Sequence, residues 1–296
     1  MILTKLSRAN LIHPPKWLIN NTVYLTIMGS QAYGVSSDDS DCDIYGICIP
    51  PKEIVFPHLG GVIKDFGNQG EQFSQWSEHH IFDPNKKVEY DFSVYNIVKY
   101  FQLCMINNPN MIDSLFTPDN CVIHRTAVSD IIRANRKIFL HKGAWHKFKG
   151  YSYAQMGKIR AKTNSNNPKR AETILKYGYD VKFAYHVVRL INEVEQILTE
   201  GDLNLQRNNE QLKDIRRGTW NILDLEEYFK RKELDLEDLY HTSKLQNAPD
   251  ENKIKELLMN CLEMHYGSIS STITNVAPDV KSMINDLQSL LDKYNT

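Results

Sequence analysis

The chain has 296 residues, of which 42% are hydrophobic and 24% charged, and its formal net charge at pH 7 is −1. These values exclude an intrinsically disordered chain and a polyanion binder that is basic over its whole surface. No stretch approaches the roughly 20 apolar residues of a membrane-spanning helix, and the first residues lack the apolar core of a secretory signal. We therefore expect a cytoplasmic protein that does not associate with membranes.

Three segments in the first third of the chain have the pattern of β-strands: residues 22–28, 43–49 and 88–94. The first is β-branched and apolar and stops at Gly29-Ser30, which predicts a buried strand followed by a turn. In the third, apolar and polar residues alternate, so that Glu89 and Asp91 share one face and the apolar residues occupy the other. Helical periodicity follows this strand over residues 97–105.

Helical patterns dominate the rest of the chain, at residues 126–140, 150–163, 170–200, 208–217, 224–232, 250–266 and 279–294. We therefore predict an α+β fold, in which a small mixed β-sheet with flanking helices precedes a mostly α-helical domain. Residues 1–120 would form the sheet domain, and residues 121–296 would close one side of its cleft. From Arg125 to Lys176 the chain carries thirteen Lys and Arg against two acids. This excess can mark one face for phosphates or reflect ordinary solvated helix faces.

Asp41 and Asp43 are the first candidate site residues. Positions i and i+2 of a strand point to the same face, so the two carboxylates would lie side by side and repel each other. A hard divalent cation with oxygen ligands, Mg²⁺ or Mn²⁺, relieves that repulsion, and substrate phosphates commonly complete its coordination. Cys42 and Ile44 would point the other way, into the core. The alternative is a solvated pair of loop carboxylates.

Gly29 and Ser30 form the second candidate element. A strand that ends in Gly-Ser and turns into a short helix exposes backbone N–H groups, which favour phosphate. Gly29 lets the backbone approach a ligand closely, and the Ser30 hydroxyl can bond a phosphate oxygen or cap a helix. The spacing from Ser30 to Asp41 allows the chain to cross a short helix and return on the next strand. A nucleoside triphosphate and its metal ion would then meet at one point.

Nucleotidyl transfer depends mostly on positioning and charge neutralisation, and two metal ions commonly clamp the attacking and leaving oxygens. Such a site needs a third carboxylate from another strand, and Glu89 and Asp91 are the candidates. We favour Asp91, which directly precedes the run into the next helix and could deprotonate the incoming hydroxyl. Asp41, Asp43 and Asp91 are thus the predicted catalytic and metal-binding residues.

The spacing from Gly29-Ser30 to Asp41-x-Asp43 resembles that of the DNA-polymerase-beta-like nucleotidyltransferase superfamily. The closest resemblance is to the predicted bacterial and phage nucleotidyltransferases called RNA-ligase-associated or YcgL-like. The segments that carry it are Gly29-Ser30-x-Ala32-Tyr33-Gly34, Ser40-Asp41-x-Asp43, Pro50-Pro51-Lys52, Asn108-Pro109-Asn110, Lys182 to Leu190 and Glu200-Gly201-Asp202-Leu203. The resemblance spans roughly residues 24–218, and the competition between Glu89 and Asp91 for the third acid departs from the family pattern.

The resemblance implies an enzyme that moves a nucleoside monophosphate from a nucleoside triphosphate, such as ATP, to an acceptor hydroxyl and releases pyrophosphate. The association of this branch with RNA ligases, together with the basic segment 125–176, points to an RNA end as acceptor, with tRNA as one candidate. A protein or a small molecule could be the acceptor for the same chemistry. A non-catalytic nucleotide-binding or partner-binding module on the same fold is the other alternative.

Several further residues have two interpretations from the sequence. Tyr33 can stack on a base or pack in the core. Lys182, His186 and Arg189 share a helix face and can bind phosphates, or they can pair with acids such as Asp180 or Glu193. Basic residues interleaved with aromatic ones can track RNA, or they can be the polar face of an amphipathic helix; the candidates are Lys158, Arg160 and Lys162. We interpret the pair His79-His80 as a loop pair and expect no zinc site.

Overall fold

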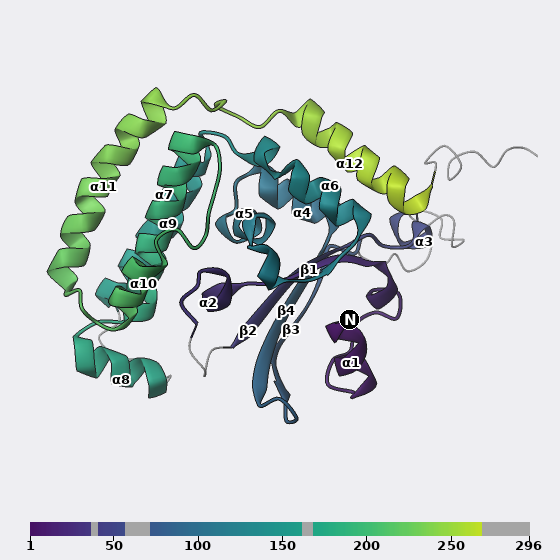
Figure 1. The fold of residues 1–296 in the computed structure, drawn as a ribbon, viewed down its shortest axis with the longest axis horizontal. Coiled ribbons are helices and arrows are strands. Elements are labelled where there is room, and N and C mark those ends of the chain that lie inside the picture. The colour runs from purple at the N-terminus through teal and green to yellow at the C-terminus, as the bar shows by residue number, and fades with distance from the viewer. Residues whose placement is uncertain (37–40, 57–71, 162–167, 268–296) are drawn as a thin grey trace, which may run out of the picture.

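A computed structural model describes residues 1–36, 41–56, 72–161 and 168–267, and its fold is drawn in Figure 1. Five strands form one mixed sheet in the order β3-β4-β2-β1-β5. The strands are β1 (Thr22–Ile27), β2 (Cys42–Cys48), β3 (Gln75–Asp83), β4 (Val88–Asn96) and β5 (Val122–Arg125). Strands β2 and β4 run parallel, whereas the pairs β1–β2, β1–β5 and β3–β4 are antiparallel. The predicted α+β fold with a small mixed sheet is confirmed.

The sheet is covered on both faces because its strands carry apolar side chains on both faces. Tyr24 of β1 belongs to a large core that includes the helices of the second half, whereas its neighbour Leu25 packs with Leu3 and Leu6 of the N-terminal helix. Cys42 and Ile44 of β2 face the N-terminal helix, as the alternation predicts. Asp43 therefore points toward the side of the sheet where the later helices lie.

Helices of the first half surround the sheet: α1 (Ile2–Arg8), α2 (Gly29–Ala32), α3 (Lys52–Val55), α4 (Ile97–Met105), α5 (Pro109–Phe116) and α6 (Ala127–Ala134). The second half contains α7 (Ala144–Ala161), α8 (Pro168–Tyr177), α9 (Val181–Glu200), α10 (Asn209–Arg216), α11 (Ile222–Thr242) and α12 (Glu251–Tyr266). Short 3₁₀ turns occur at η1 (Ile19–Asn21), η3 (Asp119–Cys121) and η4 (Arg136–Phe139). None of the helices in these described ranges is both long enough and apolar enough to cross a membrane.

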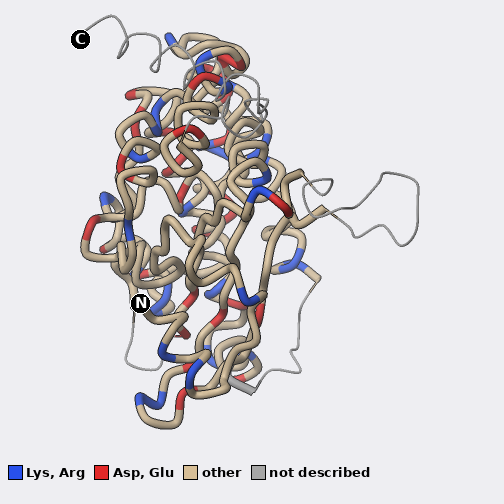
Figure 2. The backbone as a smooth tube through the Cα atoms, turned by 90° about the vertical axis from the view of Figure 1, so that its right-hand side faces the viewer, with Lys and Arg blue, Asp and Glu red and all other residues tan. Residues whose placement is uncertain are grey.

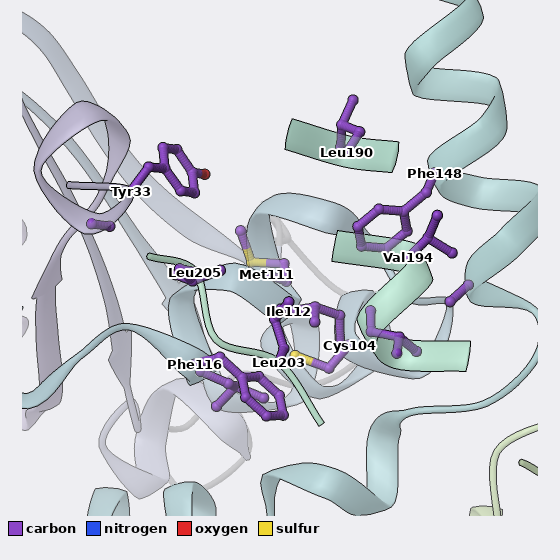
Figure 3. Close-up of a cluster of buried hydrophobic side chains, with 14 of the residues drawn as sticks. Tyr33, Cys104, Met111, Ile112, Phe116, Phe148, Leu190, Val194, Leu203 and Leu205 are labelled. Atoms are coloured by element: carbon purple, nitrogen blue, oxygen red, sulfur yellow. The ribbon is translucent and has the colours of Figure 1, made fainter. Parts of the chain in front are cut away.

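Helix α9 is the centre of the helical part and packs against α7, α10 and α11 (Figure 1). Its side chains are buried on nearly all sides, and they continue the same core that begins on the sheet. Figure 3 shows part of this core, with Met111 and Ile112 of α5, Phe148 of α7 and Val194 of α9 in one cluster. Strand β5 joins the sheet edge just after residue 120. The division into two domains at that residue stays a prediction.

The structure corrects several predicted elements. The single helix expected over 170–200 is two helices, because Gly178 has a positive φ of 80° that ends α8 and the Asp180 side chain then caps α9. The helix expected over 126–140 stops at Ala134 and continues as a 3₁₀ turn.

Helices α7 and α11 are longer than the expected segments 150–163 and 224–232. Helices α10 and α12 confirm the predictions for 208–217 and 250–266. The predicted helix 279–294 lies outside the described residues.

Candidate active site

Asp43 and Asp91 lie opposite each other on the two parallel strands β2 and β4. Neighbouring strands are about 4.8 Å apart, so the two half-buried carboxylates stand side by side at the sheet surface. Asp41 is exposed and directly precedes β2, two residues before Asp43. The three predicted metal ligands are therefore brought close together on and beside the interior strands β2 and β4.

The electrostatics of Asp43 reflect this crowding. Burial raises the pKa of its carboxyl group, and the negative charges of Asp91 and Asp41 raise it further. The positive charges of Lys182 and His79 act in the opposite direction. Carboxylates this close repel unless a cation lies among them, and an all-oxygen donor set of this kind fits Mg²⁺ or Mn²⁺.

Gly29 makes room for the Asp43 carboxylate. It has a φ of 62°, and a Cβ atom at this position would lie 2.2 Å from Asp43 Oδ2. The Met28 backbone N–H also donates a hydrogen bond of 2.8 Å to the Asp43 carbonyl oxygen. The close approach expected of Gly29 is thus made to Asp43. Ser30 follows in the short helix α2, so the Gly-Ser turn and the carboxylates adjoin.

The structure favours Asp91 over Glu89 as the third carboxylate. Asp91 lies opposite Asp43, whereas Glu89 is displaced along β4 by two residues and bonds the His80 ring at 2.5 Å. This hydrogen bond is the main cause that raises the pKa of His80, and the charge of Asp91 adds to it. The His80 backbone N–H donates to Asp91 Oδ1 at 2.7 Å, which fixes the orientation of that carboxylate.

The pair His79-His80 belongs to strand β3, and its interpretation as a loop pair is wrong. The register of β3 with β4 shifts between Glu78 and Ile81, and His80 has a φ of 58°. This irregularity breaks the alternation of apolar and polar residues, and for that reason β3 was not predicted. Strand β5 was missed because it has only four residues.

Positive charge gathers around His186 on α9. Burial lowers the pKa of the imidazole well below its ordinary value, and so do the neighbouring positive charges. Those charges, in decreasing order of effect, belong to Arg189, Lys182, Arg170 and Arg216. Lys182 is exposed on the first turn of α9, and its charge also acts on Asp43, so it lies on the carboxylate side. A neutral imidazole among several cations is a setting that suits phosphate oxygens.

Tyr33 and Arg189 lie in the protein interior, where they are only 3% and 5% exposed. The Tyr33 hydroxyl donates to Asp113 Oδ2 at 2.8 Å, and the Arg189 guanidinium stacks 4.3 Å from the Tyr33 ring. Arg189 also pairs with Asp113 and, at 2.9 Å, with Glu193. This placement favours the packing interpretation of Tyr33 and the ion-pair interpretation of Arg189 over contact with a nucleotide. Arg189 lies on the same face of α9 as Lys182, two turns further along the helix, where it is buried.

The predicted RNA-binding residues lie on α7, where Lys158 and Arg160 are both exposed. Arg160 forms a 3.1 Å ion pair with Glu226 of α11, and Lys158 lies 5.5 Å from the Phe183 ring. Lys162 lies outside the described residues. Figure 2 shows basic and acidic positions intermingled along the chain. Lys149 and Arg160 pair with Glu233 and Glu226 of α11, so the excess of Lys and Arg in residues 125–176 is partly balanced by acids from a later segment.

Some site residues were missed by the sequence reasoning. Arg170 and Arg216 come from α8 and α10 and meet His186 only in the folded protein. Asp113 of α5 compensates Arg189, and no spacing in the sequence connects them. Arg216 Nη1 donates to the Val35 carbonyl oxygen at 2.5 Å, which ties α10 to the segment after the Gly-Ser turn.

A mixed sheet that carries carboxylates on two adjacent strands beside a Gly-Ser turn is the arrangement of nucleotidyltransferases of the DNA-polymerase-beta type. The model of the RNA repair pathway DNA polymerase beta family (RlaP) matches residues 3–258. The chain belongs to this family. The resemblance inferred from the motifs is thereby confirmed, and the match extends beyond residues 24–218 at both ends.

The chain is also similar to individual proteins. Over 144 residues it is 27% identical to an uncharacterised 38.9 kDa protein from the nrdC-mobD intergenic region of Enterobacteria phage T4. This similarity covers 48% of the chain but only 39% of the phage protein. A solved structure of a nucleotidyltransferase-like protein from Exiguobacterium sibiricum covers 97% of the chain and 89% of its own length, with 9% identity and a TM-score of 0.29.

Proposed function

We propose that the protein is a metal-dependent nucleotidyltransferase that moves a nucleoside monophosphate from a nucleoside triphosphate to a hydroxyl at an RNA end. The observation that carries the proposal is the register of β2 and β4, which sets Asp43 opposite Asp91 with Asp41 two residues away. These carboxylates face the side from which the charge of Lys182 reaches Asp43. Ligands for a divalent cation and a group that neutralises phosphate thus adjoin.

Each part of the site has a role in this proposal. Asp41 and Asp43 hold Mg²⁺ or Mn²⁺, and Asp91 completes the carboxylate set. The bound cation supplies charge neutralisation for the triphosphate and for the transition state. The turn at Gly29-Ser30 receives a phosphate group through backbone N–H groups.

Lys182 and His186 bind the triphosphate from the α9 side. Lys182 contributes a positive charge, and a neutral His186 can donate one hydrogen bond from its ring. Arg170 and Arg216 add positive charge around the same imidazole. Arg189 and Tyr33 act one layer further in, where their interactions with Asp113 hold α9 against α2 and α5.

The reaction is a displacement at the α-phosphorus. The acceptor hydroxyl oxygen forms a bond to that phosphorus, the bond to the bridging oxygen of the β-phosphate breaks, and pyrophosphate leaves. Asp91 is the group that accepts the hydroxyl proton, because it stands beside the metal-binding pair and its carboxylate is oriented by the His80 backbone.

The RNA acceptor is supported by the family, which is described as belonging to an RNA repair pathway. The exposed Lys158 and Arg160 on α7 provide positive charge that could contact an RNA backbone, with tRNA as one candidate substrate. Binding through several phosphates would make the affinity for RNA fall steeply as salt is raised.

Label transfer tests the proposal. The protein is mixed with Mg²⁺, total cellular RNA and each of the four nucleoside triphosphates labelled at the α-phosphate. The Asp43→Asn variant removes one metal ligand with little change of shape, and Asp83→Asn is a matched control because Asp83 lies on β3 outside the carboxylate set. Label should enter RNA with the wild type and the Asp83→Asn variant, but not with Asp43→Asn.

Other results would replace the proposal by one of its alternatives. Label that enters protein or a small molecule instead of RNA would show that the reaction is nucleotidyl transfer but that its acceptor is not RNA. Binding of Mg²⁺ and triphosphate without label transfer to any acceptor would indicate a nucleotide-binding module that does not catalyse.

A further inference from the structure

Two consecutive histidines of β3 lie opposite a single residue of β4, the proposed third carboxylate. In the β3–β4 pairing, Glu78 is opposite Phe92 and Ile81 is opposite Tyr90. His79 and His80 are therefore the two residues that oppose Asp91. A bulge of this kind lets two neighbouring side chains turn toward the same face, where alternation would send one of them away.

The side chains around this bulge form a compact set of nitrogen and oxygen donors. Ligand atoms of His80, Glu89 and Asp91 all lie within 4.8 Å of one another. His80 Nδ1 is 2.5 Å from Glu89 Oε1, and His79 Nδ1 is 3.7 Å from Asp91 Oδ1. Atoms that share one metal ion are at most about 4.2 Å apart, because each bond is about 2.1 Å long. The spread of the three ligand atoms therefore exceeds the spacing that one ion requires by at most about 0.6 Å.

We propose that His80, Glu89 and Asp91 form a second metal site that binds a divalent transition-metal ion, with His79 beside it. Imidazole nitrogen together with carboxylate oxygen suits Mn²⁺, Fe²⁺, Co²⁺ or Zn²⁺, whereas Mg²⁺ prefers oxygen ligands alone. The chain would then hold two kinds of cation on one sheet face. Mg²⁺ would lie at the Asp41–Asp43 pair, and the softer ion at the bulge.

Two of the three ligands of the second site lie outside the first site. Its histidine comes from β3 and Glu89 from the start of β4, and neither residue has a part in the proposed nucleotidyl transfer. Asp91 is common to both sites, and its two oxygens allow it to face two ions at once. An ion at the bulge would fix the Asp91 carboxylate on the β3 side in addition to the hydrogen bond from the His80 backbone.

Cobalt binding tests this proposal, and the test is made in the Asp43→Asn background so that the carboxylate pair does not contribute. Co²⁺ is titrated by equilibrium dialysis in excess Mg²⁺, and its visible absorption reports nitrogen ligands. The full-length variants compared are Asp43→Asn alone and its combinations with His80→Gln, Glu89→Gln and His241→Gln. His241 is an exposed histidine of α11, in the helical part, and serves as the matched control.

Asp43→Asn and its combination with His241→Gln should bind one Co²⁺ per chain with equal affinity. The combinations with His80→Gln and Glu89→Gln should each bind more than about ten-fold more weakly, since loss of even an outer-shell partner costs about 10–100-fold. Unchanged binding in both of these variants, or no Co²⁺ binding by Asp43→Asn alone, would overturn the proposal. Because the label-transfer assay uses the wild type with Mg²⁺, failure of the proposed nucleotidyl transfer is observed separately from failure of this site.

Discussion

Replacing Gly29 by Ala should disable the active site by displacing Asp43. The new Cβ would lie 2.2 Å from Asp43 Oδ2, far inside an ordinary contact. The carboxylate must therefore move by about 1 Å, and a misplacement of that size can cost about 100-fold in rate. The residue also has a φ of 62°, so Ala adds backbone strain of about 1–2 kcal/mol.

Gly34→Ala is the matched control for this prediction. Gly34 has a φ of 68°, so the backbone strain is similar, but the nearest atom to its Cβ is Asn209 Nδ2 at 3.2 Å and Asp43 is not among its close neighbours. Both variants should lose a similar amount of stability in denaturant unfolding, and only Gly29→Ala should lose about 100-fold in the rate of label transfer. A Gly29→Ala rate close to that of the wild type, or an equal loss of rate in both variants, would refute the reasoning.

Three further predictions concern α9. Arg189→Leu should destabilise the protein by about 3–5 kcal/mol in denaturant unfolding, because Asp113 and Glu193 lose their buried cation; a loss under about 1 kcal/mol would contradict the buried network. Lys182→Gln should weaken triphosphate binding, measured by calorimetry, by about ten-fold, since one charge-assisted contact is worth about 1.5–3 kcal/mol. The melting temperature should not change. Equal binding by the variant and the wild type would exclude Lys182 from the phosphate site. The pKa of His186 in the folded protein lies below its ordinary value of 6.5. As the pH drops below about 6.5, the imidazole therefore binds a proton more readily in the unfolded chain than in the folded protein. The free energy of unfolding falls as a result. His186→Asn should flatten this dependence in unfolding curves at pH 5–8, and an unchanged slope would show that another group causes it.

Short-range patterns in the sequence predicted which faces of the strands the candidate carboxylates occupy. The alternation of β2 sends Asp43 to one face and Ile44 to the other, and the same rule applied to β4 identifies Asp91 as a candidate. These predictions hold because strand alternation depends on neighbouring residues only. The closeness of Asp43 to Asp91, by contrast, depends on the parallel pairing of β2 with β4, which no local pattern specifies.

The features that the sequence did not predict depend on how deeply a residue is buried and on irregular backbone conformation. Arg189 is at the spacing expected of a phosphate-binding stripe, yet α9 is buried along its length, and two acids neutralise the guanidinium there. The bulge at His79-His80 shifts the register of β3 by one residue and so conceals the strand from any period-two pattern. Gly178 interrupts one continuous helical pattern because it adopts a positive φ, which helical periodicity alone does not reveal.

In the proposed function, the three carboxylates catalyse transfer of a nucleotidyl group rather than a phosphoryl group. The most direct test compares one nucleoside triphosphate labelled at the α-phosphate with the same compound labelled at the γ-phosphate, in the presence of Mg²⁺ and RNA. The α-label should enter RNA in the wild type and should be lost in Asp41→Asn, Asp43→Asn and Asp91→Asn, while the γ-label leaves as pyrophosphate. Incorporation of the γ-label, or transfer of the α-label that survives all three substitutions, would contradict the proposed function.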